Sequence, residues 1–280
     1  MKTKEITLEM RSAVLAEYQK GVGTCEIAAQ LKVKRWVPWR ILSQAGVELR
    51  RKSVYKKKYN QQFFDKYSSE SAYWAGFILA DGNVTRNSSL LQISLSNVDK
   101  AHLLKFCQAI GLESELTPDG DCVRMSVSGK HMCQSLADNF GIHPRKSNVC
   151  VFPEQIPEHL WSHFIRGIFD GDGSVTSSQS GNLDYPSGSK RYIVANFTGS
   201  IQLLDFLKSY FHDKIGIIIG GGSVTAIPPT HIVGRHKKTG QIAYSGKNAF
   251  KILKWMYDDS YDDIRLSRKF EKFKKMEKDD

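Results

Sequence analysis

The chain has 280 residues, of which 41% are hydrophobic and 11% aromatic, so it is long enough to bury a substantial core. It contains no run of eighteen apolar residues, which excludes an ordinary membrane-spanning helix, and we expect an intracellular (cytoplasmic) protein. The net charge is +11, and residues 1–60 hold fourteen lysines and arginines against five acidic residues, a surplus of nine. Such a surplus in one short segment favours a polyanionic partner, DNA or RNA more than a membrane surface.

Three short helices are predicted for the N-terminal module, residues 1–46. Apolar side chains at helical spacing indicate a helix over 7–20 and another from about 35 to 45. Between them, Thr24 can cap a short helix over 25–31, because a threonine side chain satisfies free backbone amides at a helix start.

This order of helices resembles a helix-turn-helix, in which the last helix enters the major groove of DNA. The alternative is an ordinary three-helix scaffold with a solvated basic side. Pro38 is tolerated only in the first turn of a helix, so the last helix is expected to begin later than residue 35. Under the DNA-binding interpretation, the contacting residues are Lys34, Arg35, Trp36, Trp39 and Arg40.

Residues 47–59 form a basic linker without helical or strand periodicity. A flexible spacer is one interpretation. Alternatively, the segment follows the DNA backbone and adds affinity without sequence information. Its basic residues are Arg50, Arg51, Lys52, Lys56, Lys57 and Lys58.

Five cysteines occur without a Cys-x-x-Cys pair, and an odd number leaves one unpaired in any disulfide scheme. We predict reduced core residues and no zinc site. The cysteines are Cys25, Cys107, Cys122, Cys133 and Cys150.

A short apolar pattern ending in Asp-Gly occurs twice, at residues 74–82 and at residues 165–173. A single Asp-Gly is usually a turn or a helix C-cap with a left-handed glycine, but duplication favours a shared role. In both copies two small residues lie one helical turn apart, which lets two helix backbones approach closely. These small residues are Gly76 and Ala80 in the first copy and Gly167 and Gly171 in the second. If the helices pack side by side, Asp81 and Asp172 emerge together, and a divalent cation would relieve their repulsion.

The same order of elements recurs around both motifs. In the first half we expect a helix over 68–80, strands over 83–86 and 90–96, a helix over 98–110, strands over 113–117 and 122–128, and a helix over 130–140. In the second half we expect a helix over 158–171, strands over 174–178 and 192–198, a helix over 200–212, strands over 223–227 and 241–244, and helices over 248–257 and 262–276.

A second internal match supports the duplication. Ser-Gly-Lys precedes a helix in each half and ends in Lys130 and Lys247. Each lysine could simply lie at a surface junction between loop and helix. The longer second half has its extra residues in two hairpins, 176–190 and 228–240, and the second hairpin is basic. Its basic side chains are Arg235, His236, Lys237 and Lys238.

The duplicated motif resembles that of the LAGLIDADG homing endonucleases, in the single-chain form with two motif copies. The resemblance covers residues 60–276. It implies an α+β fold of two pseudo-symmetric αββαββα repeats, residues 60–150 and 151–280, which form a DNA-binding saddle beside the all-α helix-turn-helix module.

The eighth letter of the motif is the family's metal-binding acidic residue, which corresponds here to Asp81 and Asp172. The resemblance therefore implies a Mg²⁺ site, which Mn²⁺ could also fill, at these residues and the adjoining backbone. The adjoining residues are Ala80, Gly82, Gly171 and Gly173. At the sixth letter Leu79 replaces the usual Asp in the first copy, while Asp170 keeps it in the second, which we interpret as a packing difference.

In the family a lysine beside the active site polarises the attacking water or stabilises phosphate charge. By position, this role falls on Lys130 and Lys247. A polar residue on the second strand of each repeat lies close to the catalytic water. It corresponds to Gln92 in the first half, and Asn196 is the nearest candidate in the second.

The implied function is metal-dependent cleavage of both strands of a long, asymmetric double-stranded DNA target by a monomer. Cutting would occur across the minor groove and leave short 3′ overhangs. The alternatives are a DNA-binding regulator that does not cleave and an RNA maturase that assists intron folding. Such regulators have lost the acidic residues, whereas this chain keeps both. Maturases can keep the motif, and RNA is a partner only under that alternative.

Overall fold

The computed structural model divides the chain into two compact units, residues 1–56 and 57–280, each with its own hydrophobic core. The described residues are 6–49, 58–85, 87, 89–113, 115–144, 151–180, 190–217, 225–226 and 239–279. None of the helices in these ranges is long and apolar enough to cross a membrane.

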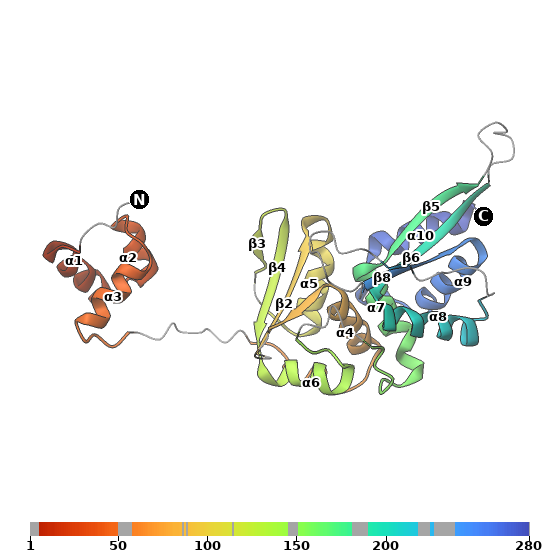
Figure 1. Ribbon diagram of the computed structural model, residues 1–280, viewed down its shortest axis with the longest axis horizontal. Coiled ribbons are helices and arrows are strands. Elements are labelled where there is room, and N and C mark those ends of the chain that lie inside the picture. Colours follow the sequence, from red (N-terminus) through yellow and green to blue (C-terminus); the bar gives the residue numbers. More distant parts are fainter. Residues whose placement is uncertain are drawn as a thin grey trace. The chain divides into compact units, whose positions relative to one another are not determined.

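The first unit consists of three helices, α1 (Leu8–Gln19), α2 (Thr24–Gln30) and α3 (Trp36–Gln44), shown in Figure 1. The prediction that Thr24 caps the second helix is wrong: Gly23 occupies the N-cap position, without a side-chain cap, and Thr24 is the first helical residue. The expectation that Pro38 makes the third helix begin later than residue 35 is confirmed, because α3 begins at Trp36. Pro38 is the third residue of α3, in the first turn, where a backbone N–H has no partner inside the helix.

The first repeat has one four-stranded antiparallel sheet in the order β1-β2-β4-β3. Its elements are α4 (Ser69–Asp81), β1 (Gly82–Val84), β2 (Leu90–Ser96), the 3-10 helix η1 (Asn97–Asp99), α5 (Lys100–Ala109), β3 (Thr117–Asp119), β4 (Cys122–Ser128) and α6 (Lys130–Phe140).

Strand β3 lies later in the chain than the predicted strand over 113–117. Its residues pair with the start of β4, with Asp119 opposite Cys122. The two strands are therefore joined by a two-residue turn, and Gly120 supplies the positive φ of +62° that such a turn requires. The position of β3 in the chain is therefore set by the turn at Gly120, and not by the alternation of apolar residues over 113–117.

The second repeat has the same sheet order, β5-β6-β8-β7. Its elements are η3 (Glu158–Leu160), α7 (Trp161–Asp172), β5 (Ser174–Ser180), β6 (Lys190–Ser200), α8 (Ile201–Ile215), β7 (Thr225–Ala226), β8 (Thr239–Ser245) and α9 (Gly246–Tyr257), followed by η5 (Asp262–Ile264) and α10 (Ser267–Asp279).

The predicted continuous helix over 262–276 is wrong. Arg265 has an extended backbone, with φ −154° and ψ 148°, between η5 and α10. The next residue, Leu266, donates its backbone N–H to the side chain of Asp170 at 2.7 Å. A tertiary hydrogen bond thus replaces the one that a continuous helix would have made.

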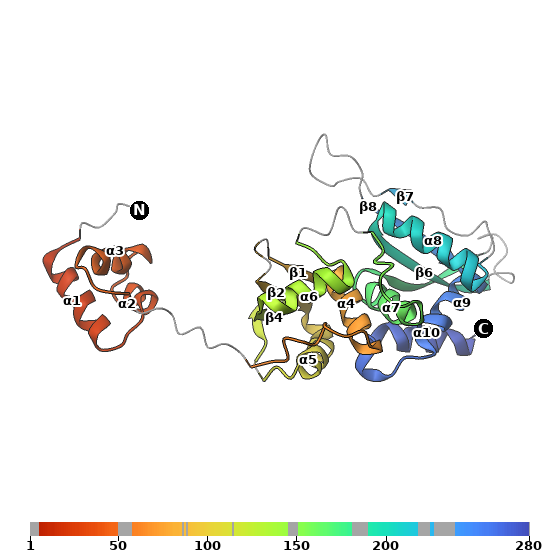
Figure 2. The same ribbon diagram turned by 90° about the horizontal axis from the view of Figure 1, so that it is seen from below.

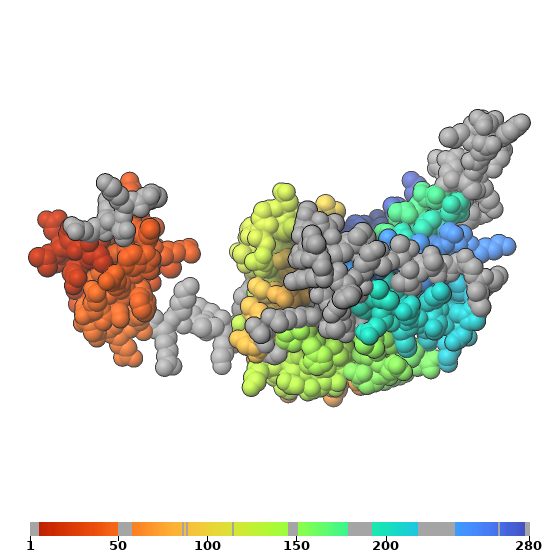
Figure 3. All heavy atoms as spheres, in the orientation of Figure 1, coloured from red at the N-terminus to blue at the C-terminus, as the bar shows by residue number. Residues whose placement is uncertain are grey.

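In each repeat the helices pack against one face of the sheet, and the burial pattern shows why. Along β2, Leu91, Ile93 and Leu95 are buried, while the alternate residues lie on the other face. Figures 1 and 2 show α4 and α7 side by side between the two sheets. In the space-filling view, coloured residues of the two repeats adjoin along the lower edge of the second unit (Figure 3).

The cysteine prediction holds in part. The four described cysteines are free thiols, and Cys107 and Cys133 are buried in the core as expected. Cys25, however, is exposed on the first unit. Cys150 lies outside the described residues.

Candidate active site

The two motif helices cross at glycines. A Cβ built on Gly76 would lie 2.0 Å from the carbonyl oxygen of Phe164, and a Cβ on Gly167 would lie 2.1 Å from the carbonyl oxygen of Tyr73. Only glycine fits where two backbones approach this closely. The side-by-side packing of the two motif helices, predicted from their small residues, is confirmed.

Asp81 and Asp172 are the last residues of α4 and α7, and both are exposed. A Cβ built on Gly171 would lie 2.4 Å from the Cβ of Ala80 and 3.4 Å from Oδ2 of Asp81. The Asp81 carboxylate therefore lies against the last turn of α7, which ends in Asp172. Both aspartates emerge at the same end of the helix pair.

The glycines that follow the aspartates are not left-handed caps, as a single Asp-Gly pair would suggest. Gly82 and Gly173 have φ angles of −83° and −85°. A Cβ on Gly82 would lie 2.7 Å from the carbonyl oxygen of Ile78, and a Cβ on Gly173 would lie 2.5 Å from the ring of Phe169. Each motif therefore ends in glycine because there is no space for a Cβ atom at Gly82 or Gly173, and not because the backbone there has a positive φ.

The donor set at the helix ends fits Mg²⁺. The C-terminal end of a helix carries a partial negative charge, and the two carboxylates add to it and repel each other. Mg²⁺ prefers oxygen ligands and commonly takes one or two carboxylates together with substrate phosphates. Among the described residues, no group of three or more His, Cys, Asp or Glu side chains could hold a metal ion. Substrate oxygens or water would therefore have to complete the coordination.

Asp170, the sixth letter of the second motif, is turned into the core and is 1% exposed. It accepts hydrogen bonds from the hydroxyl groups of Tyr73 at 2.9 Å and Tyr257 at 2.7 Å, in addition to the backbone N–H of Leu266. Burial raises the pKa of Asp170 above its usual range. The corresponding Leu79 of the first motif is buried in the apolar core. At the sixth position, the first motif therefore packs an apolar side chain into the core, while the second places a hydrogen-bonded carboxylate there.

Lys269, on α10, is a charged residue at this site that the sequence analysis missed. It is 5% exposed, and burial lowers its pKa to about 8 although Asp170 acts in the opposite direction. Its ammonium group donates hydrogen bonds to four carbonyl oxygens at the end of α7. They belong to Phe169 at 2.7 Å, Asp170 at 2.7 Å, Gly171 at 3.2 Å and Gly173 at 2.5 Å.

The sheet register decides which polar residue of the second repeat is equivalent to Gln92. Gln92 pairs with Asn83, two residues after the first motif aspartate. Asn196 pairs with Ser174, two residues after the second. Both amides bond to a serine on a neighbouring strand: Gln92 donates to Ser126 Oγ and Asn196 to Ser174 Oγ, each at 3.2 Å. Asn196 therefore occupies the position of Gln92.

Lys130 and Lys247 are exposed at the starts of α6 and α9. Gln92 pairs with Ser126 of β4, and Lys130 comes four residues after Ser126. In the same way Asn196 pairs with Ala243 of β8, and Lys247 comes four residues after Ala243. Ser126 aligns through Gln92 with Asn83 of β1, so Lys130 comes four residues after the position level with Asn83, at the start of α6.

The outer face of the first sheet is polar. At its centre Arg124 donates to Ser94 Oγ at 3.0 Å and forms an ion pair with Asp119. The polar residues of β1, β2 and β4 on this face are Asn83, Gln92, Ser94, Ser96, Arg124, Ser126 and Ser128.

The predicted DNA-binding residues of the first unit lie on its surface. The exposed set is Lys34, Arg35, Trp36, Trp39 and Arg40. The side chain of Arg40 lies over the ring of Trp36, 5.7 Å from its centroid. Lys58 is also exposed. The other basic residues named from the sequence, Arg50, Arg51, Lys52, Lys56, Lys57, Arg235, His236, Lys237 and Lys238, lie outside the described residues.

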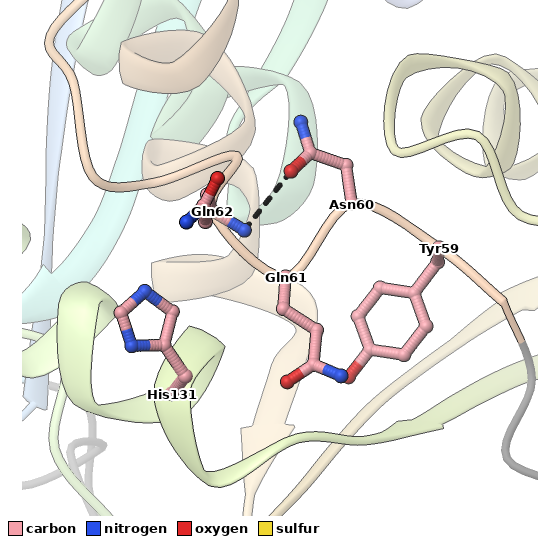
Figure 4. Close-up of a pocket in the computed structure, with 5 residues that line it drawn as sticks. All are labelled: Tyr59, Asn60, Gln61, Gln62 and His131. Atoms are coloured by element: carbon pink, nitrogen blue, oxygen red, sulfur yellow. Dashed lines mark hydrogen bonds between the residues drawn. The ribbon is translucent and has the colours of Figure 1, made fainter.

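An open pocket of about 450 Å³ lies at the start of the second unit, beside the first turn of α6 (Figure 4). Its lining consists of Tyr59, Asn60, Gln61, Gln62 and His131. A Cβ on Gly129 would lie 2.0 Å from the Tyr59 hydroxyl, so this contact explains the glycine of the first Ser-Gly-Lys. The pocket includes neither motif aspartate and is separate from the paired helix ends.

Comparison with solved structures assigns the fold. The chain is similar to meganuclease I-SmaMI bound to uncleavable DNA, with a TM-score of 0.51, 11% identity, and coverage of 75% of this chain and 89% of that chain. It is similar to a single-lysine variant of I-SmaMI, with a TM-score of 0.50, 12% identity, and coverage of 75% and 90%. For the I-LtrWI LAGLIDADG homing endonuclease bound to target DNA, the TM-score is 0.49, the identity 11%, and the coverage 78% and 90%.

No protein-family model and no curated protein sequence matches the chain. At these identities the structural likeness shows the fold, and the expected α+β architecture of two LAGLIDADG repeats is confirmed.

Proposed function

We propose that this chain, with the fold of the LAGLIDADG homing endonucleases, is a metal-dependent endonuclease that cuts both strands of a long, asymmetric DNA site. The observation that carries the proposal is the pair of exposed aspartates at the end where α4 and α7 meet. The two carboxylates, each at the negative end of a helix, repel each other. Such an arrangement is useful where a cation and phosphate oxygens are to be bound.

In this proposal Asp81 and Asp172 hold Mg²⁺ against the two scissile phosphates, one carboxylate from each repeat. When bound, Mg²⁺ lowers the pKa of a water molecule and offsets charge that develops on the phosphate. Gln92 and Asn196 orient water through their side-chain amides.

Lys130 and Lys247 contribute positive charge to the phosphates that flank the cut.

The polar sheet faces would lie in the major groove, where hydrogen-bond patterns distinguish all four base pairs. In the first repeat Arg124, held by Asp119, is suited to a guanine, whose major-groove edge presents two acceptors. The basic first unit extends the contact along the duplex and adds phosphate contacts.

Cleavage of a randomised duplex DNA library in Mg²⁺, followed by sequencing of the cut ends, tests the proposal. The wild type should cut one long asymmetric site, with Mn²⁺ able to replace Mg²⁺. Asp81→Asn and Asp172→Asn should abolish cutting of at least one strand while DNA affinity stays within about tenfold. Asp205→Asn, the same chemical change at an exposed position of α8, serves as the control and should cut normally.

Binding without cutting, in either metal, would refute the nuclease proposal and favour a regulator. A preference for structured RNA over duplex DNA would favour a maturase. Lys130→Ala and Lys247→Ala should slow cutting more than they weaken binding. Equal losses would mean that these lysines are only backbone contacts.

A further inference from the structure

The C-terminal segment, residues 257–279, is anchored to both repeats. Arg268 forms an ion pair with Asp99 of the first repeat, at 2.8 Å. Lys105, also of the first repeat, donates to the carbonyl oxygen of Asp262 at 2.6 Å. Leu266 is bonded to the second motif helix through Asp170, and this places α10 beside the end of α7.

From this position Lys269 inserts its ammonium group into the end of α7. The last carbonyl groups of a helix have no partner within the helix and carry its negative dipole. A cation that donates to four carbonyls around this end satisfies them and sets the path of the chain through Gly171, Asp172 and Gly173. A buried charge is costly unless it is fully hydrogen-bonded, and Lys269 meets that condition.

This arrangement belongs to the second repeat. Among the described residues between α6 and η3, 141–144 and 151–157, there is no helix equivalent to α10. Lys269 of α10 thus donates its hydrogen bonds to the end of α7, the motif helix that carries Asp172.

We propose that Lys269 is a positioning residue for Asp172. It holds the turn at the end of α7 so that the Asp172 carboxylate faces the same site as Asp81 before substrate binds. The inference rests on the proposed nuclease function, and it goes further by assigning the C-terminal helix a role in one of the two strand cuts. Because each aspartate of a pseudo-symmetric pair serves mainly one scissile phosphate, loosening one of them slows mainly one cut.

Lys269→Met tests the proposal in the full-length protein, since methionine keeps an unbranched side chain only one atom shorter and removes its donors. Lys272→Met is the matched control, because it removes the same charge from an exposed position of the same helix. Three quantities are measured: the nicking rate of each strand in single turnover at saturating DNA, the DNA affinity in Ca²⁺, and hydrogen exchange of the metal-free protein over residues 165–175.

We expect Lys269→Met to slow one strand at least about tenfold more than the other, since small displacements at a reacting centre have large kinetic effects. DNA affinity should change less than about threefold, and exchange at the end of α7 should accelerate because the turn opens more often. Lys272→Met should match the wild type in all three. Equal slowing of both strands, or unchanged rates and exchange, would overturn the proposal.

If Lys269→Met does not fold, Lys269→Gln keeps two donors for the carbonyls and should show the same inequality between strands. If the wild-type protein cuts no DNA, the proposed function fails by itself. The exchange measurement then still decides whether Lys269 holds the turn: acceleration confined to the end of α7 supports this role, and unchanged exchange refutes it.

Discussion

Replacing Gly76 with alanine should force the two motif helices apart. The new Cβ would lie 2.0 Å from the carbonyl oxygen of Phe164 and 3.1 Å from the backbone nitrogen of Ile168. Non-bonded heavy atoms prefer separations of about 3.5 Å, so the backbones must move apart by roughly 1.5 Å. The obstacle is backbone of the neighbouring helix, so no change of side-chain rotamer can relieve it.

Two effects of opposite sign set the magnitude. Overpacking a core costs about 1–3 kcal/mol and sometimes more. Alanine in place of glycine inside a helix returns up to about 1 kcal/mol. We therefore expect a net loss of about 1–2 kcal/mol in the free energy of unfolding. Cleavage should fall by more, about 100-fold, because the same displacement separates Asp81 from Asp172.

Urea denaturation of the purified protein gives the stability, and single-turnover cleavage of the selected site gives the rate. Gly199→Ala is the control. A Cβ there would meet only the side chain of Leu203, at 3.1 Å, so this variant should cut normally and lose little stability. If Gly76→Ala were as stable and as active as the wild type, close helix contact would not be what places the aspartates.

Three further outcomes are expected. Burial lowers the pKa of His102 to about 3 and that of His163 to about 4. Both pKa values lie below the value of 6.5 that a histidine has in the unfolded chain. The neutral side chains therefore contribute their full stability above pH 6.5, and this contribution is lost as the pH falls towards the folded-state pKa values. For His102 the loss at pH 5 is about 2 kcal/mol, and a urea midpoint equal at pH 7.5 and pH 5 would contradict it. Asp170→Leu leaves two tyrosine hydroxyls and a backbone N–H without their acceptor. The free energy of unfolding, measured with urea, should therefore fall by about 3 kcal/mol or more. An unchanged free energy of unfolding would mean that the hydrogen-bond network relaxes around the leucine. Deleting residues 1–56 should flatten the dependence of DNA affinity on salt, by about one unit of log–log slope for each lost phosphate contact, and an unchanged slope would show that the first unit does not contact DNA.

Local patterns in the sequence predicted the elements well where one face of an element is buried along its whole length. The two strands over 90–96 and 122–128 have the predicted bounds, because strict alternation reports burial on one face. The expectations failed where a single contact decides the conformation. One such case is the turn at Gly120, which fixes β3. Another is the break at Arg265, where the next residue donates its backbone N–H to the distant carboxylate of Asp170.

By itself, the sequence determined the duplication, the helix pair and the place of Asp81 and Asp172, because motif spacing and small residues are local features that repeat along the chain. Only the tertiary structure decided what surrounds them. Lys269 lies about a hundred residues from the helix end that it contacts, on a segment whose composition indicates no more than a basic surface helix. The equivalence of Asn196 and Gln92 likewise depends on which strand lies beside which. Contacts between distant segments leave no periodic trace in either segment, so their partners emerge only when the chain is folded.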